Sequence, residues 1–328
     1  MASGRSTPVT IRRGKPEQPP EGPALRLLSC NGRPSPRSRR PSIRTIAVLS
    51  GRGGVGKSTL VANLGIAMRR RGLSVLLVDG DLGMSGLDPL LGVEPTGCTS
   101  QDIVRGTRRA SEVVVRTRED VTLMPAAPGV EEMANLDELS CERLYRSLHE
   151  IEDETDLILL DTAAGLGRTT MHFARCASER ILVTTPEPAA FTSAYAILRA
   201  LGYAAAHDGG GAHRPASPPP PYLVVNQAHD AEEGASVARR IRDVARRFLS
   251  IDPVYLGCIP VDGAVGSAVR RQEPLLRLYP RCAASLSIEE LAARLLESGD
   301  PDPGVTPVPG WSFGARNGRE RERERIPA

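Results

Sequence analysis

A glycine-rich stretch, called the P-loop below, runs from Ser50 to Thr59 and contains a lysine and a serine, Lys57 and Ser58, after its last glycine. It fits the pattern G-x-x-x-x-G-K-[ST]. Glycines let the backbone approach a phosphate without Cβ clashes, and N–H groups at a helix N-terminus attract its charge. Lys57 would reach the β- and γ-phosphates, and the Ser58 hydroxyl would bind Mg²⁺. A glycine turn that binds nothing is the plain alternative. The residues predicted to hold the phosphates are Gly51, Gly53, Gly54, Val55, Gly56, Lys57, Ser58 and Thr59.

Three aspartates lie at or just after the ends of apolar runs. Asp79 and Asp81 come after residues 74–78, and Asp161 ends an apolar run in the Walker B form, in which the carboxylate supports Mg²⁺. Ligand chemistry gathers at the carboxyl ends of parallel strands, so these side chains are candidates for metal binding and water positioning. The predicted metal ligands are Ser58, Asp79 and Asp161, with solvated acids in a turn as the alternative for the Asp79–Asp81 pair.

Strands and helices alternate around these residues, and the strands are continuously apolar. This pattern predicts an α/β fold, a Rossmann-like P-loop NTPase with a mainly parallel sheet and helices on both faces. The predicted strands are 45–49, 74–78, 121–125, 156–162, 180–184, 222–226 and 255–260. The predicted helices are 60–68, 101–105, 136–151, 191–201, 235–249, 263–272 and 287–298.

Composition divides the chain of 328 residues into three parts. Residues 1–43 and 299–328 are rich in Pro, Arg and Gly or in alternating charges, and we expect disordered tails there. Residues 44–298 contain every predicted strand and helix, with an aliphatic core because aromatic residues make up only 3% of the chain. Six scattered cysteines and the lack of a secretory leader or long apolar run predict a cytoplasmic protein with reduced thiols.

Several segments within residues 44–298 carry a resemblance to the MinD/ParA ATPases, which implies that this span is an ATPase domain. The sequence Gly51-Arg52-Gly53-Gly54-Val55-Gly56-Lys57-Ser58 resembles their deviant Walker A motif, and Asp79–Gly83 and Asp161–Gly165 resemble their switch regions. Within this family the chain is most similar to the FlhG branch, the regulators of flagellar number and placement. That similarity is carried by residues 184–188, 191–196, 223–226 and 257–262.

The resemblance implies an ATP- and Mg²⁺-dependent ATPase that hydrolyses slowly and forms an ATP-bound homodimer. It implies that Lys57 binds phosphate and that Asp81 positions the attacking water. It also implies adenine contacts from Asn226, Pro260, Val261 and Asp262. The partners implied are a second copy of the chain and a flagellar GTPase or flagellar regulator.

Three features depart from the family pattern. Arg52 stands where the family has a signature lysine that crosses to the partner's phosphates, so the resemblance implies a catalytic role for Arg52 across a dimer. Because arginine is longer, planar and bidentate, slower hydrolysis is the alternative. Residues 1–42 lack the Asp-Gln-Ala activating motif, and Trp311 and Phe313 lie in a segment without the apolar stripe of a membrane helix. The resemblance alone would place the protein at the inner face of the cell membrane, and the third departure argues against membrane binding.

Other functions remain open at this point. The arginines between Arg239 and Arg247 would suit a ParA-type partition ATPase that binds DNA nonspecifically, although a solvated helix face is the simpler interpretation. A nucleotide-binding adaptor without turnover is a further alternative because of Arg52. An Fe–S carrier of the Mrp type would require a C-x-x-C motif, which the sequence does not contain.

Overall fold

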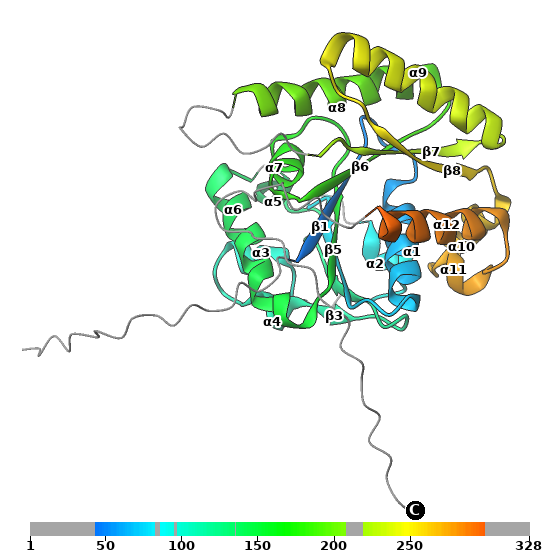
Figure 1. Cartoon of the computed structure of the whole chain (residues 1–328). Coiled ribbons are helices and arrows are strands. Elements are labelled where there is room, and N and C mark those ends of the chain that lie inside the picture. Colours follow the sequence, from blue (N-terminus) through cyan, green and yellow to red (C-terminus); the bar gives the residue numbers. More distant parts are fainter. Residues whose placement is uncertain (1–42, 83–85, 95–96, 135, 208–218, 299–328) are drawn as a thin grey trace, which may run out of the picture. The chain divides into compact units, whose positions relative to one another are not determined.

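The computed structural model describes residues 43–82, 86–94, 97–134, 136–207 and 219–298 (Figure 1). Apart from Ile43, the two predicted tails lie outside these residues, as do Trp311 and Phe313. The domain boundaries at 44 and 298 therefore stay predictions.

The described strands form one sheet of eight, in the order β3-β4-β2-β5-β1-β6-β7-β8. Neighbouring strands run parallel, except that β3 pairs antiparallel with β4. This confirms the predicted α/β class with its mainly parallel sheet. The strands are β1 (Arg44–Leu49), β2 (Val75–Gly80), β3 (Val115–Arg116), β4 (Thr122–Met124), β5 (Leu157–Thr162), β6 (Glu179–Thr184), β7 (Tyr222–Ala228) and β8 (Val254–Pro260).

Successive side chains of the central strands enter two different cores, because a strand turns alternate residues to opposite faces. In β5, Ile158 and Leu160 join the core on one face, whereas Leu157 and Leu159 join the core on the other. Asp161 continues the odd-numbered series, so it belongs to the second face. The same alternation in β2 assigns Asp79 to that face.

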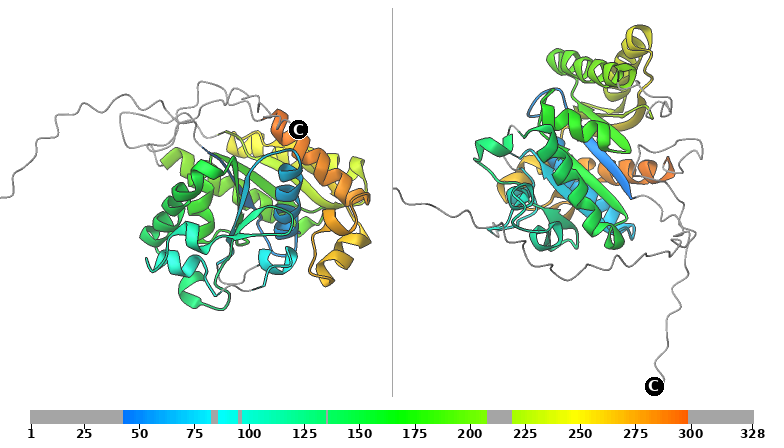
Figure 2. Two further views of the ribbon diagram at one scale, coloured as in Figure 1. Left: turned by 90° about the horizontal axis from the view of Figure 1, so that it is seen from below. Right: turned by 90° about the vertical axis from the view of Figure 1, so that its left-hand side faces the viewer.

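Helices cover both faces, as Figure 2 shows from two further directions. The first face carries α3 (Ser100–Val104), α4 (Ala110–Val113), α5 (Glu131–Ala134), α6 (Glu138–Ser147), α7 (Arg168–Cys176), α8 (Pro188–His207) and α9 (Ala231–Leu249). The second face carries α1 (Lys57–Arg70), α2 (Leu87–Leu90), α10 (Gly263–Arg270), α11 (Leu275–Leu278) and α12 (Ala283–Glu297). The P-loop helix α1 thus lies on the same face as Asp79 and Asp161.

The structure differs from the predicted elements at several helix ends, and it adds the short strand β3 and the short helices α2, α4, α5, α7 and α11. The helix predicted over 136–151 is α-helical only to Ser147 and continues as a 3₁₀ helix over Leu148–Glu154. Helix α8 begins at Pro188, before the predicted start, because proline fits the first helical turn, where its missing N–H costs no bond. Helix α9 begins four residues early, where the Asp230 side chain accepts a hydrogen bond from the Glu233 N–H.

Candidate functional site

The P-loop connects the end of β1 to the start of α1, as the sequence predicts. Two of its glycines are required by close approaches. A Cβ on Gly51 would lie 2.3 Å from the Ser193 carbonyl oxygen in α8. Gly56 adopts a φ of 84° just before α1, and a Cβ there would lie 2.3 Å from Asn226 Nδ2. Around Gly53 and Gly54, by contrast, no atom lies within 4 Å of the ideal Cβ position. This backbone is therefore open enough for a phosphate to approach.

Lys57 and Asp161 form the central buried pair of the site. The Lys57 Nζ lies 2.5 Å from Asp161 Oδ1, and the two side chains are 7% and 0% exposed. Burial raises the pKa of the Asp161 carboxyl, the positive charge of Lys57 opposes this rise, and the charge of Asp81 adds to it. The three predicted residues therefore lie in one electrostatic environment.

The second carboxylate oxygen of Asp161 is available to a ligand. Asp161 Oδ2 is buried and has no hydrogen-bond partner among the described residues. A buried acceptor without a donor is costly unless a ligand or a metal ion satisfies it. Together with the Ser58 hydroxyl at the first turn of α1, this oxygen fits a hard divalent cation such as Mg²⁺.

Asp79 holds the backbone that follows β2. It lies directly opposite Asp161 in the pairing of β2 with β5 and is fully buried. Asp79 Oδ2 accepts hydrogen bonds from the N–H groups of Gly86 at 2.9 Å and Leu87 at 3.1 Å. Asp79 Oδ1 accepts from the Asp81 N–H at 3.2 Å. These bonds give Asp79 a positioning role in this structure, and its predicted role as a metal ligand stays a prediction.

The segment after β5, Ala163–Gly167, is called the switch loop below. Its Gly165 N–H donates to the Ser50 carbonyl at 2.8 Å, which joins the switch loop to the P-loop. The Thr170 hydroxyl of α7 donates to the Ala163 carbonyl at 3.1 Å. A displacement of the switch loop would therefore act on the P-loop and on the first turn of α7.

Arg52 lies on the exposed part of the P-loop. Its guanidinium forms an ion pair with Glu187, which follows β6, and the two side chains are 41% and 58% exposed. The Ser50 hydroxyl donates to the Arg52 carbonyl at 3.0 Å. This places the side chain at the surface, where a second molecule can reach it, and its predicted catalytic role stays a prediction.

The residues predicted to contact adenine lie at the carboxyl ends of β7 and β8. Asn226 Nδ2 donates to the Val55 carbonyl at 2.7 Å, so this side chain supports the P-loop. Ala228, two residues further along β7, pairs with Pro260. Val261 is 71% exposed, whereas the Asp262 carboxylate accepts from the N–H groups of Ala264 and Ala284. Val261 is thus exposed, Asp262 caps α10 and the start of α12, and the adenine contacts of these residues stay predictions.

Sequence reasoning missed three residues that shape the site. Gln227 Nε2 donates to the Gly54 carbonyl at 3.1 Å, and Gln227 has a φ of 58°. Glu187 and Ser193 meet the P-loop from the α8 side. These contacts join segments far apart in the chain, so no local pattern signals them. The nearest sequence signal was the Thr-Thr-Pro-Glu-Pro stretch that contains Glu187.

Two further predictions concern surfaces. Three arginines of α9 contact side chains outside this helix. Arg242 and Arg246 pair with Asp252, and Arg240 stacks over the Phe191 ring. Among the described residues, no helix combines the length and apolar character that a membrane span needs.

Comparison with known proteins agrees with this geometry. Residues 46–275 match the family model of the CobQ/CobB/MinD/ParA nucleotide-binding domain. The antiactivator FleN of Pseudomonas aeruginosa is 33% identical over 253 residues, which cover 77% of this chain and 86% of FleN. The flagellum site-determining protein YlxH of Helicobacter pylori is 28% identical over 252 residues, or 76% of this chain and 81% of YlxH.

Among solved structures, the septum site-determining protein MinD of Pyrococcus horikoshii, complexed with Mg-ADP, superposes with a TM-score of 0.63. It is 26% identical and covers 79% of this chain and 98% of its own. The predicted resemblance to the MinD/ParA ATPases, with similarity to flagellar regulators, is confirmed. The glycine loop, the buried lysine–aspartate pair, the family match and these relatives together show that the chain belongs to the CobQ/CobB/MinD/ParA family of nucleotide-binding proteins.

Proposed function

We propose that this protein binds ATP with Mg²⁺, hydrolyses it slowly, and changes from a monomer to a dimer when ATP is bound. We propose further that it regulates the number or placement of flagella. It would act in the cytoplasm on a flagellar GTPase or flagellar regulator. Its similarity to FleN and to the flagellum site-determining protein YlxH supports this biological role.

The buried Lys57–Asp161 pair is the observation that carries the proposed activity. An ammonium group at the end of a glycine loop suits the β- and γ-phosphates, and here it is held against a carboxylate with one unpartnered oxygen. Asp161 and Ser58 would hold Mg²⁺, and Asp79 is the third predicted ligand. The metal would supply charge neutralisation at the phosphates. Asp81, at the end of β2, would accept a hydrogen bond from the attacking water.

Substitution of Lys57 tests the nucleotide site. In the full chain, Lys57→Ala should lose ATP binding in equilibrium titration with a fluorescent ATP analogue while it keeps the far-ultraviolet circular dichroism of the parent. Arg118→Ala removes an exposed cation far from the P-loop in sequence and serves as the matched control. Unchanged nucleotide affinity in a folded Lys57→Ala protein would refute the assignment.

Measurements of ATP hydrolysis and of molecular mass in solution distinguish the proposed function from its alternatives. Phosphate release should be slow but measurable, and light scattering should show a dimer with ATP and a monomer with ADP. An adaptor without turnover would bind ATP and release no phosphate. A partition ATPase would shift random-sequence duplex DNA in a salt-dependent manner only with ATP. Arg240, Arg242 and Arg246 contact Phe191 and Asp252 at the surface, and exposed contacts of this kind are weak, so the DNA assay decides between the two functions.

A further inference from the structure

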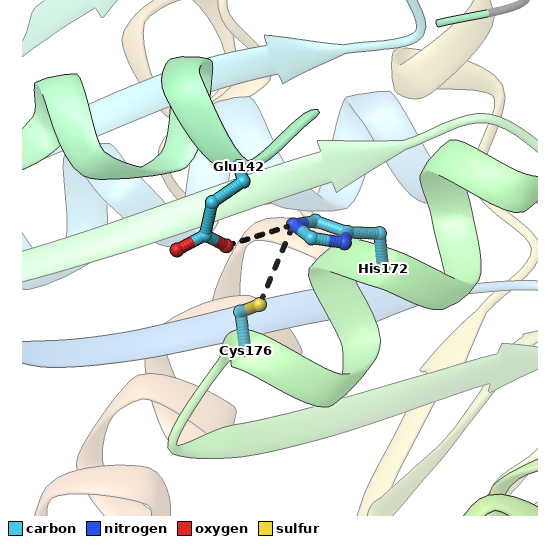
Figure 3. A group of neighbouring side chains, drawn as sticks. All are labelled: Glu142, His172 and Cys176. Carbon is cyan, nitrogen blue, oxygen red and sulfur yellow. Dashed lines mark hydrogen bonds and ion pairs between the residues drawn. The ribbon is translucent and has the colours of Figure 1, made fainter. Parts of the chain in front are cut away.

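A second cluster of ligand-type side chains lies between α6 and α7, separate from the nucleotide site. It consists of Glu142 on α6 and of His172 and Cys176 on α7, which point toward one another in Figure 3. His172 Nε2 lies 3.6 Å from Cys176 Sγ and 3.5 Å from Glu142 Oε2. All three ligand atoms lie within 4.8 Å of one another.

The helices hold these side chains in place. His172 and Cys176 are four residues apart, so they share one face of α7. Leu144 and Tyr145 of α6 are buried in the same core as Phe173 and Ala174 of α7. The Tyr145 hydroxyl also donates to the Cys176 carbonyl at 2.8 Å, which fixes the end of α7 against α6. The three donor groups therefore approach one another without a change in the fold.

The distances suit a tetrahedral transition metal. Zinc bonds of about 2.3 Å to sulfur and about 2.0–2.2 Å to nitrogen and oxygen imply ligand–ligand separations of about 3.4–3.6 Å in a tetrahedron. The two separations measured from His172 Nε2 are 3.6 Å and 3.5 Å. The third, from sulfur to oxygen, can shorten by rotation of Glu142, whose side chain is 37% exposed. A small adjustment of one flexible residue would complete the geometry.

We infer that Glu142, His172 and Cys176 form a binding site for Zn²⁺ or a similar transition-metal ion, with water as the fourth ligand. Thiolate, imidazole and carboxylate together favour such an ion over Mg²⁺, which prefers oxygen ligands only. In the structure Glu142 Oε1 accepts from Arg146 Nε at 2.6 Å, which leaves Oε2 for the metal.

A nucleophilic role for Cys176 is less well supported. Burial raises the pKa of the Cys176 thiol to about 11. The thiolate is both the nucleophile and the metal ligand, and a bound cation would favour its formation here, whereas a nucleophile would have no such charge beside it. The bound metal would join α6 to α7, the helix that directly follows the switch loop. The site would thus stabilise the helix pair beside the nucleotide site without contributing a ligand to it.

Cobalt titration of the nucleotide-free full chain, kept reduced, tests this inference. Co²⁺ should give a thiolate-to-metal charge-transfer band and the visible bands of tetrahedral cobalt, both saturating at one equivalent. Zn²⁺ should abolish these bands by displacement. Cys176→Ser should remove the charge-transfer band, and His172→Ala should weaken cobalt binding at least about tenfold, since even outer-shell changes cost that much.

Matched substitutions locate the site. Cys282→Ser and His229→Ala, which change the same residue types elsewhere, should leave the cobalt spectrum and affinity unchanged. Glu142→Gln, which keeps the side-chain size, should weaken cobalt binding. It provides a second test of the site if the cysteine variant does not fold. No charge-transfer band in the parent, or the same band in folded Cys176→Ser, would overturn the inference. These outcomes are independent of ATP binding, so they do not bear on the proposed function.

Discussion

The Arg52 guanidinium is paired with the Glu187 carboxylate of its own chain, on the exposed side of the P-loop. Exposed ion pairs contribute only about 0–1 kcal/mol, so this one can exchange at little cost. A cation held this loosely can leave Glu187 for the phosphates of a second subunit. The ion pair therefore does not prevent a role for Arg52 across a dimer, and that role stays a prediction.

Mixing two inactive variants tests this role. Arg52→Ala subunits keep Asp81, and Asp81→Ala subunits keep Arg52. If Arg52 acts in trans, a mixed dimer has one complete site and regains part of the turnover that each variant lacks, because an arginine finger can contribute ~10³–10⁵ in rate. Phosphate release is measured on the mixture, with dimers confirmed by sedimentation. Glu187→Gln should keep turnover, and no recovery in confirmed mixed dimers would mean that Arg52 acts in cis or not at all.

Removal of the Asp81 carboxylate should separate ATP binding from hydrolysis. Asp81 is half-buried and directly follows β2, close enough to Asp161 to raise the pKa of that carboxyl. We expect Asp81→Ala to bind ATP, to hydrolyse it far more slowly and to remain dimeric by light scattering. Asp88→Ala, in the short helix α2, is the control for loss of a nearby acid. An Asp81→Ala protein with the turnover of the parent would exclude the proposed role.

Three glycines of the P-loop offer a graded test of its backbone. Gly53→Ala meets no atom and needs no left-handed conformation, so it should change the free energy of unfolding by less than about 0.5 kcal/mol. Gly54→Ala forces an alanine into the left-handed conformation, with a φ of 80°, and should lower the free energy of unfolding by about 1–2 kcal/mol. Gly56→Ala adds a clash with Asn226 to the same strain and should cost more. Urea unfolding measures these free energies. Equal losses for Gly54→Ala and Gly56→Ala would show that the Asn226 side chain moves aside without cost.

Stability at low pH should depend on Asp262. Hydrogen bonds from the backbone N–H groups of Ala264 and then Ala284 lower the pKa of its carboxyl from 3.8. A carboxyl with a lowered pKa in the folded state adds stability above pH ~4 and loses it as the pH falls through the folded value. At neutral pH, Asp262→Ala should lower the free energy of unfolding by about 1 kcal/mol for each of the two helix N-termini that Asp262 caps.

Asp262→Asn is the matched variant, because its amide oxygen still accepts the two hydrogen bonds but does not titrate. The stability of Asp262→Asn should vary less with pH below pH ~4 than that of the parent. Thermal unfolding between pH 3 and 7 measures both effects. Identical pH profiles for the parent and Asp262→Asn would show that the caps do not depend on the charge.

The span 44–298 should suffice for nucleotide binding and ATP-dependent dimerisation. Every residue assigned to the site lies within it, and the tails have the composition of disordered segments. Size-exclusion chromatography with light scattering, with and without ATP, compares this fragment with the full chain. An insoluble fragment, or one that does not bind ATP, would show that a tail belongs to the fold.

The sequence predicts seven of the eight described strands because their apolar runs are continuous, and it misses β3, which has only two residues. The short helices α2, α4, α5, α7 and α11 were not predicted, since four to nine residues give little periodicity. The P-loop and its buried partner Asp161 follow from local motifs. The hydrogen bonds of Asp79 to Gly86 and Leu87, and those of Asn226 and Gln227 to the P-loop, depend on how distant segments pack. Such contacts leave no trace in the spacing of residues.

Helix α1 buries its apolar face partly against α12, the last helix described. Leu60, Leu64 and Ile66 share a core with Ile288 and Leu291, and Arg70 and Arg71 pair with Glu289. On the ribosome, α1 is synthesised long before α12. The part of its apolar face that packs against α12 therefore stays exposed until α12 has been made. We expect the nascent chain to gain nucleotide affinity late in translation. A chain terminated before Ala283 would then expose the apolar face of the P-loop helix, which chaperones can bind, and would not act as an ATPase.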